Sequence, residues 1–560
     1  MADSFLLVIA RIVSAWFWIR SVGFYIKKLF FAYFKFPTFQ ERRYQKITFW
    51  GALVLSIDIL RKKILEKLLR IKQRLLRISE KISNKAMLYA YDWYESAIYK
   101  KKYAVEIGAQ LGFGKDSFER VVLKIKICIL NGEIKTAFQN FEMLIEKYPR
   151  KRSELNQIAV HAFLKAEYSL SERMWSSIQI ATKTQLKLSG IDSIGYRFLA
   201  PSWILAIGHI AHLDTYFKNK ILNGDNNKVY FQMPIGFEIP NKELFNKWVE
   251  KGYINSGIPA NIGSLDEVEV DLLTEEFWSQ PVDTNHSMMF SHAGSVIQRR
   301  WEAEGRESLL SLNPADKKEG NECLQRLGVP AGAWYVCLHV RDQGFHQNWD
   351  KAHPSARNAN IDNYLPAARE IVKRGGFVIR MGDKSMKKLV NEQGIIDYPH
   401  SEYKSQFMDV FLCATAKFFI GTNSGLGLVP PIFGVPCALT NWIPIGIPQW
   451  YPRDIYIPKL IYSNQLKRNL TFDEMLHTNA GWIQFEESMA AQGLVAIPNT
   501  EEDIMDVVVE MLERETGHST ANEASLLKQR SFEKMIEISN SFVGARIGHK
   551  FLEKYEHLLA

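Results

Sequence analysis

Residues 335–346 read YVCLHVRDQGFH, and the stretch changes character halfway along. Its beginning is typical of a buried β-strand, because four of its first five residues are apolar. Polar side chains then follow within eight positions, namely His339, Arg341, Asp342 and His346. This pattern predicts a core strand that leaves the protein interior where its polar residues begin.

The chain beyond this stretch alternates between predicted helices and strands. Helices are predicted at 360–375, 384–393, 404–416 and 426–434, and strands at 376–383, 395–399, 417–425 and 435–442. This order predicts a parallel sheet covered on both faces, with ligands at the carboxyl ends of its strands. Polar residues also follow two of the later strands, namely Asp383, Thr422, Asn423 and Ser424. We therefore expect several polar strand ends to converge on one crevice.

The residues of this crevice favour a phosphate ligand. Arg341 has a planar, permanently charged guanidinium that suits a phosphate, and Arg380 could act in the same way from the neighbouring predicted strand. In GTNSGLG (421–427), Gly421 and Gly425 allow a ligand close to the backbone just before a predicted helix N-terminus. The motif lacks the GxxxxGK[ST] spacing of a P-loop, so its weight comes from its expected position beside Arg341.

A second, less regular α/β unit is predicted at about residues 195–315. Residues 201–222 have the pattern of a strand, a tight turn at Gly208 that carries His209, and a helix. The next strand and helix are predicted at 228–234 and 241–251. This succession is typical of the opening of a Rossmann-like domain.

The middle of the chain, residues 84–190, has sparse glycine and helical apolar spacing. Gly132 at a turn, followed by Ala137, Phe141 and Pro149, has the spacing of one tetratricopeptide (TPR) unit. An ordinary helical hairpin is equally compatible with such a short pattern. We predict a TPR-like helical region that can dock a protein partner.

The basic charge of the chain is confined to its N-terminus. Residues 1–80 hold 16 Lys or Arg against 5 Asp or Glu, whereas the remaining residues hold 54 against 56. Cations interrupt the apolar run 5–34 before about 20 uncharged residues occur, which argues against a transmembrane helix. Aromatic and basic residues here, and the amphipathic pattern of 60–82, predict helices on an anionic membrane surface. The alternative is that the aromatic residues pack on the protein and the charges form a solvated face.

Composition places the chain among globular proteins. Its residues are 47% hydrophobic and 23% charged, the usual mixture of a globular protein. Its length of 560 residues predicts two or three domains. Five scattered cysteines without a CxxC pair or a metal-ligand cluster predict reduced thiols, a cytosolic body and no metal site. Because the basic residues avoid the crevice domain, we expect no nucleic-acid partner.

Five segments, in order, resemble a family of bacterial glycosyltransferases with GT-B architecture. They are LHVRDQGF (338–345), GGFVIRMGD (375–383), IDYPHSEYKSQFMDVFLCATAKFFIGTNSGL (396–426), FGVPCALTNW (433–442) and FVGARIGHKFLEKY (542–555). The resemblance covers roughly residues 190–560. It implies two Rossmann-like domains that face each other across a cleft. The second domain would bind a nucleotide-sugar donor and the first would help to hold the acceptor.

A more distant similarity is to the fucosyltransferase clan, in which a His-x-Arg element after the first strand of the donor domain meets the donor's diphosphate. His339 and Arg341 match that element. Asp342 stands where members of that clan often have a second basic residue. The similarity therefore implies glycosyl transfer without implying a fucose donor.

Glycosyl transfer requires positive groups where charge builds up on the departing diphosphate. We assign this role to Arg341, whose alternative role is a structural ion pair with Asp342 or another carboxylate. Phosphate and nucleotide contacts are expected from His339, Arg380, Asp383, Lys404, Ser405, Asp409, Thr422, Asn423, Ser424 and the amides after Gly425. The general base for the acceptor hydroxyl would be Asp342, His346 or His209, and no spacing selects among them. The nucleotide sugar is a substrate, and neither a cofactor nor a metal is expected.

The sequence thus predicts an α/β protein of GT-B type. Its predicted parts are basic amphipathic helices (1–83), a TPR-like region (84–190), an acceptor domain (191–320), a nucleotide-sugar domain (321–520) and C-terminal helices (521–560). The expected acceptor is a bacterial surface glycan, glycolipid or glycoprotein at the cytoplasmic face of the inner membrane. The chief alternative is a membrane-tethered scaffold that binds a nucleotide or sugar without turnover.

Overall fold

The computed structural model describes residues 118–165, 167–231, 237–259, 262–343, 355–447, 449–518, 522–538 and 544–559. The predicted membrane helices (1–83), the start of the helical region (84–117) and His346 lie outside these residues. All described residues belong to one compact unit, Lys101–Ala560. None of the helices described there is long and apolar enough to cross a membrane.

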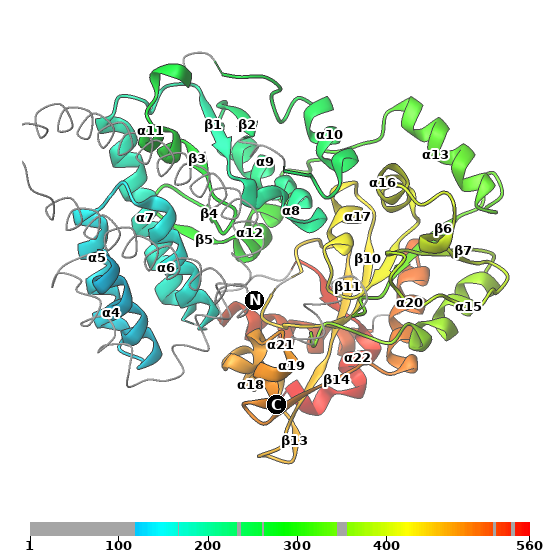
Figure 1. The fold of residues 1–560 in the computed structure, drawn as a ribbon. Helices are drawn as coiled ribbons and strands as arrows, with labels where there is room; N and C mark the ends of the chain where they lie inside the picture. Colours follow the sequence, from blue (N-terminus) through cyan, green and yellow to red (C-terminus); the bar gives the residue numbers. More distant parts are fainter. Residues whose placement is uncertain are drawn as a thin grey trace, which may run out of the picture. The chain divides into compact units, whose positions relative to one another are not determined.

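Within the part of the chain that the structure describes, helices α4 to α7 precede the α/β units (Figure 1). They are α4 (Phe118–Leu130), α5 (Ile134–Lys147), α6 (Arg152–Leu164) and α7 (Tyr168–Leu188). Gly132 makes the turn between α4 and α5 with φ +74°, a left-handed conformation that favours glycine. Ala137 and Phe141 of α5 are completely buried. This is the small-large packing expected of a helical hairpin, and a TPR identity stays a prediction.

The first α/β unit contains a three-stranded parallel sheet. Strand β1 (Tyr196–Leu199) lies between β2 (Lys228–Phe231) and β3 (Thr274–Glu275). A strand was expected within 201–222, but β1 ends before Pro201, which cannot donate a backbone hydrogen bond. Residues 201–204 instead form a 3₁₀ turn. The rest of the unit comprises α8 (Ile207–Ala211), α9 (Leu213–Leu222), α10 (Lys242–Glu250), α11 (Glu267–Leu272), hairpin strands β4 (Ser279–Pro281) and β5 (Ser287–Met289), and α12 (Phe290–Ala303).

A seven-stranded parallel sheet forms the centre of the second α/β unit. Its order is β15-β11-β10-β9-β6-β7-β8, which confirms the predicted α/β class with a large parallel sheet. The strands are β6 (Tyr335–His339), β7 (Phe377–Arg380), β8 (Ile395–Asp397), β9 (Phe419–Gly421), β10 (Cys437–Trp442), β11 (Ile455–Pro458) and β15 (Arg546–Ile547). Val336, Cys337 and Phe419 are completely inaccessible to solvent, as continuous apolar strands of a covered sheet require.

The direction of the chain reverses at β6. Strands β7 and β8 follow on one side of β6, and the chain then returns to place β9, β10 and β11 on the other. Helix α15 (Leu365–Lys373) connects β6 to β7, and α16 (Gln406–Thr415) connects β8 to β9. Right-handed crossovers in opposite directions put these helices on opposite faces of the sheet. Ligands of doubly wound sheets bind at such a switch point, here between β6 and β9.

The prediction of a helix at 384–393 is wrong, because the segment begins with a turn at 384–385 and continues as irregular backbone with one isolated bridge at Glu392. Asp383 accepts a hydrogen bond from the Ser385 amide (2.9 Å), which starts a local turn. Asp397 of β8 then accepts the Leu389 amide (2.9 Å). Side chains therefore take the backbone donors that a helix would have used.

The remaining elements complete the second unit and the C-terminal part. They are α13 (Pro314–Arg326), α17 (Val429–Ile432), the antiparallel strands β12 (Leu460–Ser463), β13 (Arg468–Asn469) and β14 (Leu494–Ile497), and the helices α18 (Phe472–Leu476), α19 (Glu486–Ala490), α20 (Glu501–Glu515), α21 (Glu523–Ile538) and α22 (His549–Lys554). Helix α20 packs against α15, β10 and β11, so the C-terminal helices form part of the cover of the large sheet.

Candidate active site

The switch point brings Arg341 to the 421–425 turn. His339, the last residue of β6, pairs with Gly421, the last residue of β9. Just beyond this pair, the Arg341 amide donates to the Thr422 hydroxyl (3.0 Å), and the Thr422 amide donates to the His339 carbonyl (3.2 Å). Thr422 is completely buried, so its hydroxyl fixes the backbone of Arg341 rather than facing a ligand.

His339 is a buried, neutral imidazole. Burial, together with the positive charges of Arg380, Arg341 and Lys404, lowers the pKa of His339 to about 3. Its Nδ1 lies 3.1 Å from the Ser424 hydroxyl. His339 therefore orients Ser424 and adds no charge of its own at neutral pH.

The helix expected after Gly425 is reduced to a 3₁₀ turn (Leu426–Leu428) and the four-residue α17. The Gly427 amide donates to the Ser424 carbonyl (3.1 Å) and lies 3.3 Å from the Ser424 hydroxyl. The side-chain amide of Asn423 donates to the Ile443 carbonyl (2.9 Å). The Gly427 amide and the Asn423 side chain therefore bond within the protein. The free N–H groups of a helix N-terminus that were expected to bind phosphate are thus largely absent.

Arg380 is not placed as a second phosphate ligand. Its guanidinium forms an ion pair with Asp397 (3.0 Å) and donates to the Lys387 carbonyl (3.1 Å). Only 1% of Arg380 is exposed. Because β7 lies beside β8, the arginine turns towards the carboxylate of the next strand, and loss of either partner would leave a buried charge unpaired.

Three more residues predicted for the nucleotide, Lys404, Ser405 and Asp409, form a polar cluster at the start of α16. Ser405 caps this helix by accepting the Met408 amide (3.1 Å). Asp409 forms an ion pair with Lys404 and accepts the Tyr398 hydroxyl (2.9 Å). Burial raises the pKa of Asp409, and the charge of Lys404 opposes this effect. These groups are already paired with one another, so nothing in their geometry assigns them to a nucleotide.

The two α/β units meet at Gly208 and Gly425. A Cβ atom on Gly208 would lie 2.7 Å from the Gly425 Cα, so the two backbones are in direct contact. His209 follows Gly208 and stacks on Phe277, with ring centroids 4.3 Å apart. Its Nδ1 lies 2.6 Å from the Ser202 carbonyl oxygen, which can only accept, so Nδ1 carries the proton. His209 thus follows the residue that contacts the turn, its ring packs on its own unit, and its role across the cleft stays a prediction.

Replacement of Gly208 by alanine is expected to disturb this junction. The new methyl group would collide with backbone, which cannot rotate away, so we expect a loss of about 1–3 kcal/mol in the free energy of unfolding. Chemical denaturation of the full chain measures this loss. Gly263→Ala is the matched control, because a Cβ there meets nothing within 4 Å and needs no unusual φ. Equal stability of the two variants would contradict the contact.

Sequence reasoning missed Asn358, which bonds Arg341, and Lys459, which bonds Asn358. The Asn358 side-chain oxygen accepts a hydrogen bond from Arg341, and Lys459 donates to the Asn358 carbonyl (2.8 Å). Lys459 directly follows β11, and a lysine after an apolar strand was the signal that could have identified it. Asn358 belongs to no pattern, since only the folded chain brings it next to Arg341.

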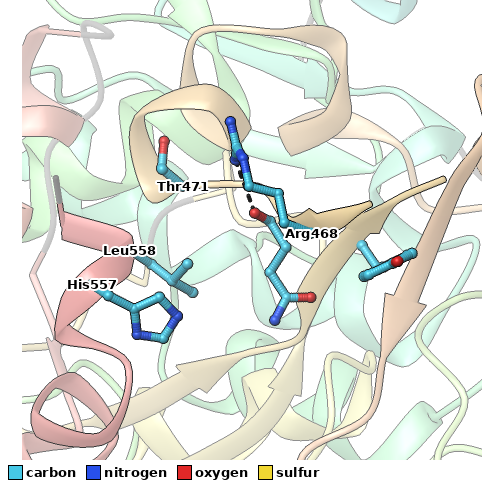
Figure 2. Close-up of a pocket in the computed structure, with 6 residues that line it drawn as sticks. Arg468, Thr471, His557 and Leu558 are labelled. Carbon is cyan, nitrogen blue, oxygen red and sulfur yellow. Dashed lines mark hydrogen bonds between the residues drawn. The ribbon is translucent and has the colours of Figure 1, made fainter. Parts of the chain in front are cut away.

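A surface pocket of about 480 Å³ lies between β12, β13, α18 and the C-terminal residues (Figure 2). Arg468 lines it, but its guanidinium is held by both oxygens of Glu474 (2.7 and 2.8 Å). None of the residues predicted for the crevice lines this pocket. Among the described residues there is also no group of three or more His, Cys, Asp or Glu side chains that could hold a metal ion.

The sequence matches no protein-family model, and no curated protein is significantly similar to it. Solved structures with partial likeness include two of the iron-containing dodecameric heptosyltransferase TibC, one in complex with ADP-D-beta-D-heptose and one from enterotoxigenic E. coli. Both have a TM-score of 0.26 and are 14% identical to this chain. The matched region is 44% of this chain, and it is 58% of the first TibC chain and 57% of the second. A glycosyltransferase family 9 structure from Veillonella parvula has a TM-score of 0.27 and 9% identity, covering 44% of this chain and 80% of its own. The match thus spans less than two thirds of the TibC chains, and likeness at these TM-scores does not establish a shared fold.

Proposed function

We propose that the chain is a GT-B-type glycosyltransferase that moves a sugar from a nucleoside-diphosphate sugar to an acceptor hydroxyl. The observation that carries this proposal is the position of Arg341 beside the 421–425 turn, at the switch point of the large sheet. The first α/β unit reaches the same turn through Gly208, the residue that precedes His209. A donor site on one unit and a candidate base on the other suit a transfer reaction between two substrates.

Arg341 would bind the donor's diphosphate and stabilise the charge that develops on it as the glycosidic bond breaks. A fixed guanidinium is suited to this task because its charge is permanent and its donors are planar. The Ser424 hydroxyl, oriented by His339, would donate to a phosphate oxygen. No metal is required in this proposal, since Arg341 supplies the positive charge.

His209 would accept the proton of the acceptor hydroxyl. Its Nδ1 proton is committed to Ser202, so the free lone pair lies on Nε2, for which no described residue provides a hydrogen-bond partner. Burial lowers the pKa of His209, which keeps the ring neutral and able to accept a proton at neutral pH. These features favour His209 over Asp342, and His346 lies outside the described residues.

The donor base can be identified by the change in melting temperature with UDP, GDP, CMP, ADP and dTDP. We expect one nucleoside diphosphate to stabilise the protein by about 2.7 kcal/mol at 100 times its Kd, because binding to the native state alone shifts the folding equilibrium. The matching nucleotide sugars should then be consumed with release or transfer of the sugar. Binding without any sugar release would identify a non-catalytic scaffold, and no binding would refute the proposal.

We further propose that residues 1–83 attach the enzyme peripherally to the cytoplasmic face of the inner membrane, close to a surface glycan, glycolipid or glycoprotein acceptor. The support is the net positive charge of this segment and its aromatic residues. Cosedimentation with anionic liposomes should be lost when residues 1–80 are removed. Equal cosedimentation of the full and shortened chains would refute the membrane attachment.

A further inference from the structure

Lys459 is a buried cation with an incomplete set of partners. Only 4% of the residue is exposed, and its ammonium group donates to the Asn358 carbonyl at 2.8 Å. This is the one hydrogen bond that its three N–H donors make among the described residues. Burial lowers the pKa of Lys459 to about 8, opposed by the charge of Glu486, whose carboxylate makes no hydrogen bond to the ammonium. A buried ammonium group without a bonded anion is costly for the fold.

Asn358 adds a second unused donor at the same place. Its side-chain oxygen accepts from Arg341, but its side-chain nitrogen is buried and has no hydrogen-bond partner. The following residue, Ala359, donates its amide to the Arg341 carbonyl (3.0 Å), which fixes the segment against Arg341. Arg341 therefore bonds the side-chain oxygen of Asn358, and Lys459 bonds the backbone carbonyl of the same residue.

We propose that Lys459, the side-chain nitrogen of Asn358 and Arg341 together form a binding site for one phosphate group of a nucleoside diphosphate. This inference rests on the proposed function and supplies the second cation that Arg380 cannot provide. The unused groups of Lys459 and Asn358 are all donors, and a phosphate oxygen accepts several charge-assisted hydrogen bonds at once. The anion would also compensate the buried ammonium group. Arg341 is only half-buried, so a ligand can reach the cluster from that side.

Lys459→Met tests this site by isothermal titration of the full chain with the nucleoside diphosphate that stabilises it, the matching monophosphate and the free nucleoside. We expect the affinity for the diphosphate to fall about 10- to 100-fold, as loss of a hydrogen bond from a charged group predicts. Affinity for the nucleoside should remain unchanged. The melting temperature of the unliganded variant should rise, because the buried charge has been removed, whereas loss of a merely structural lysine would lower it. The matched control is Lys550→Met in α22, whose ammonium pairs with Asp506 at 2.7 Å.

Asn358→Asp gives an independent test with a side chain of the same shape. The new carboxylate would pair with Lys459 and Arg341 and compete with the phosphate, so diphosphate affinity should again fall while the fold is retained. Unchanged diphosphate affinity in both variants would overturn the inference and leave the proposed function standing. A parent protein that binds no nucleoside diphosphate would overturn both.

Discussion

Replacement of Arg341 by alanine should reduce kcat/KM for the nucleotide sugar by about 10³-fold or more. Groups that stabilise the charge of a departing or transferring phosphate contribute on this scale, which corresponds to about 4 kcal/mol of transition-state stabilisation. In this chain the effect should be large because Arg380 is held by Asp397 and cannot substitute for the missing guanidinium. Initial rates of donor consumption, with water or sugar acceptors, measure the loss.

Arg341→Lys separates charge from geometry. Lysine retains the positive charge but lacks the planar group that reaches Asn358, so we expect most of the activity to remain lost. The fold should survive both changes, because the contact with Thr422 is made by the backbone amide of residue 341. Arg468→Ala, at the exposed pocket of Figure 2, is the control for removing an arginine elsewhere. Full donor turnover by Arg341→Ala would refute the assignment of the active site.

The main lines of the second α/β unit could be predicted from the sequence because its strands are continuous apolar runs. The alternation of strands and helices implied a parallel sheet, and the polar residues after 335–339 and 419–421 implied a site at their carboxyl ends. The pairing of β6 with β9 then brings Arg341 to Thr422, although the two residues are far apart in the sequence. Local patterns were sufficient here since strand ends of one sheet must share an edge.

Side-chain partners could not be predicted in the same way. The sequence places Arg380 after a strand just as it places Arg341, but only the order of the sheet reveals that Asp397 lies beside it. Lys459 and Asn358 are 101 positions apart and join only in the folded chain. The contact of Gly208 with Gly425 likewise forms only in the folded chain, because the two residues lie on different units.

The His209→Asn variant should lower kcat about 10²- to 10⁴-fold while leaving donor affinity unchanged. Asparagine can still donate to the Ser202 carbonyl as the histidine Nδ1 does, but it has no basic nitrogen in the place of Nε2. His477→Asn is the control, because its imidazole lies at the surface at the end of α18, where Nδ1 is 3.0 Å from the Asp473 carboxylate. A loss of donor affinity instead of kcat would indicate that His209 positions the donor.

The pH dependence of the parent enzyme gives a second readout for His209. A general base acts in its unprotonated form, so kcat/KM should fall as the pH falls through the pKa of His209. Because burial lowers that pKa below its usual 6.5, the enzyme should keep its activity at pH 6.5 and lose it only under more acidic conditions. His209→Asn should lose this acidic limb along with most of its rate. An acidic limb that persists unchanged in the variant would assign the base to another group, and Asp342 would then be the first to test.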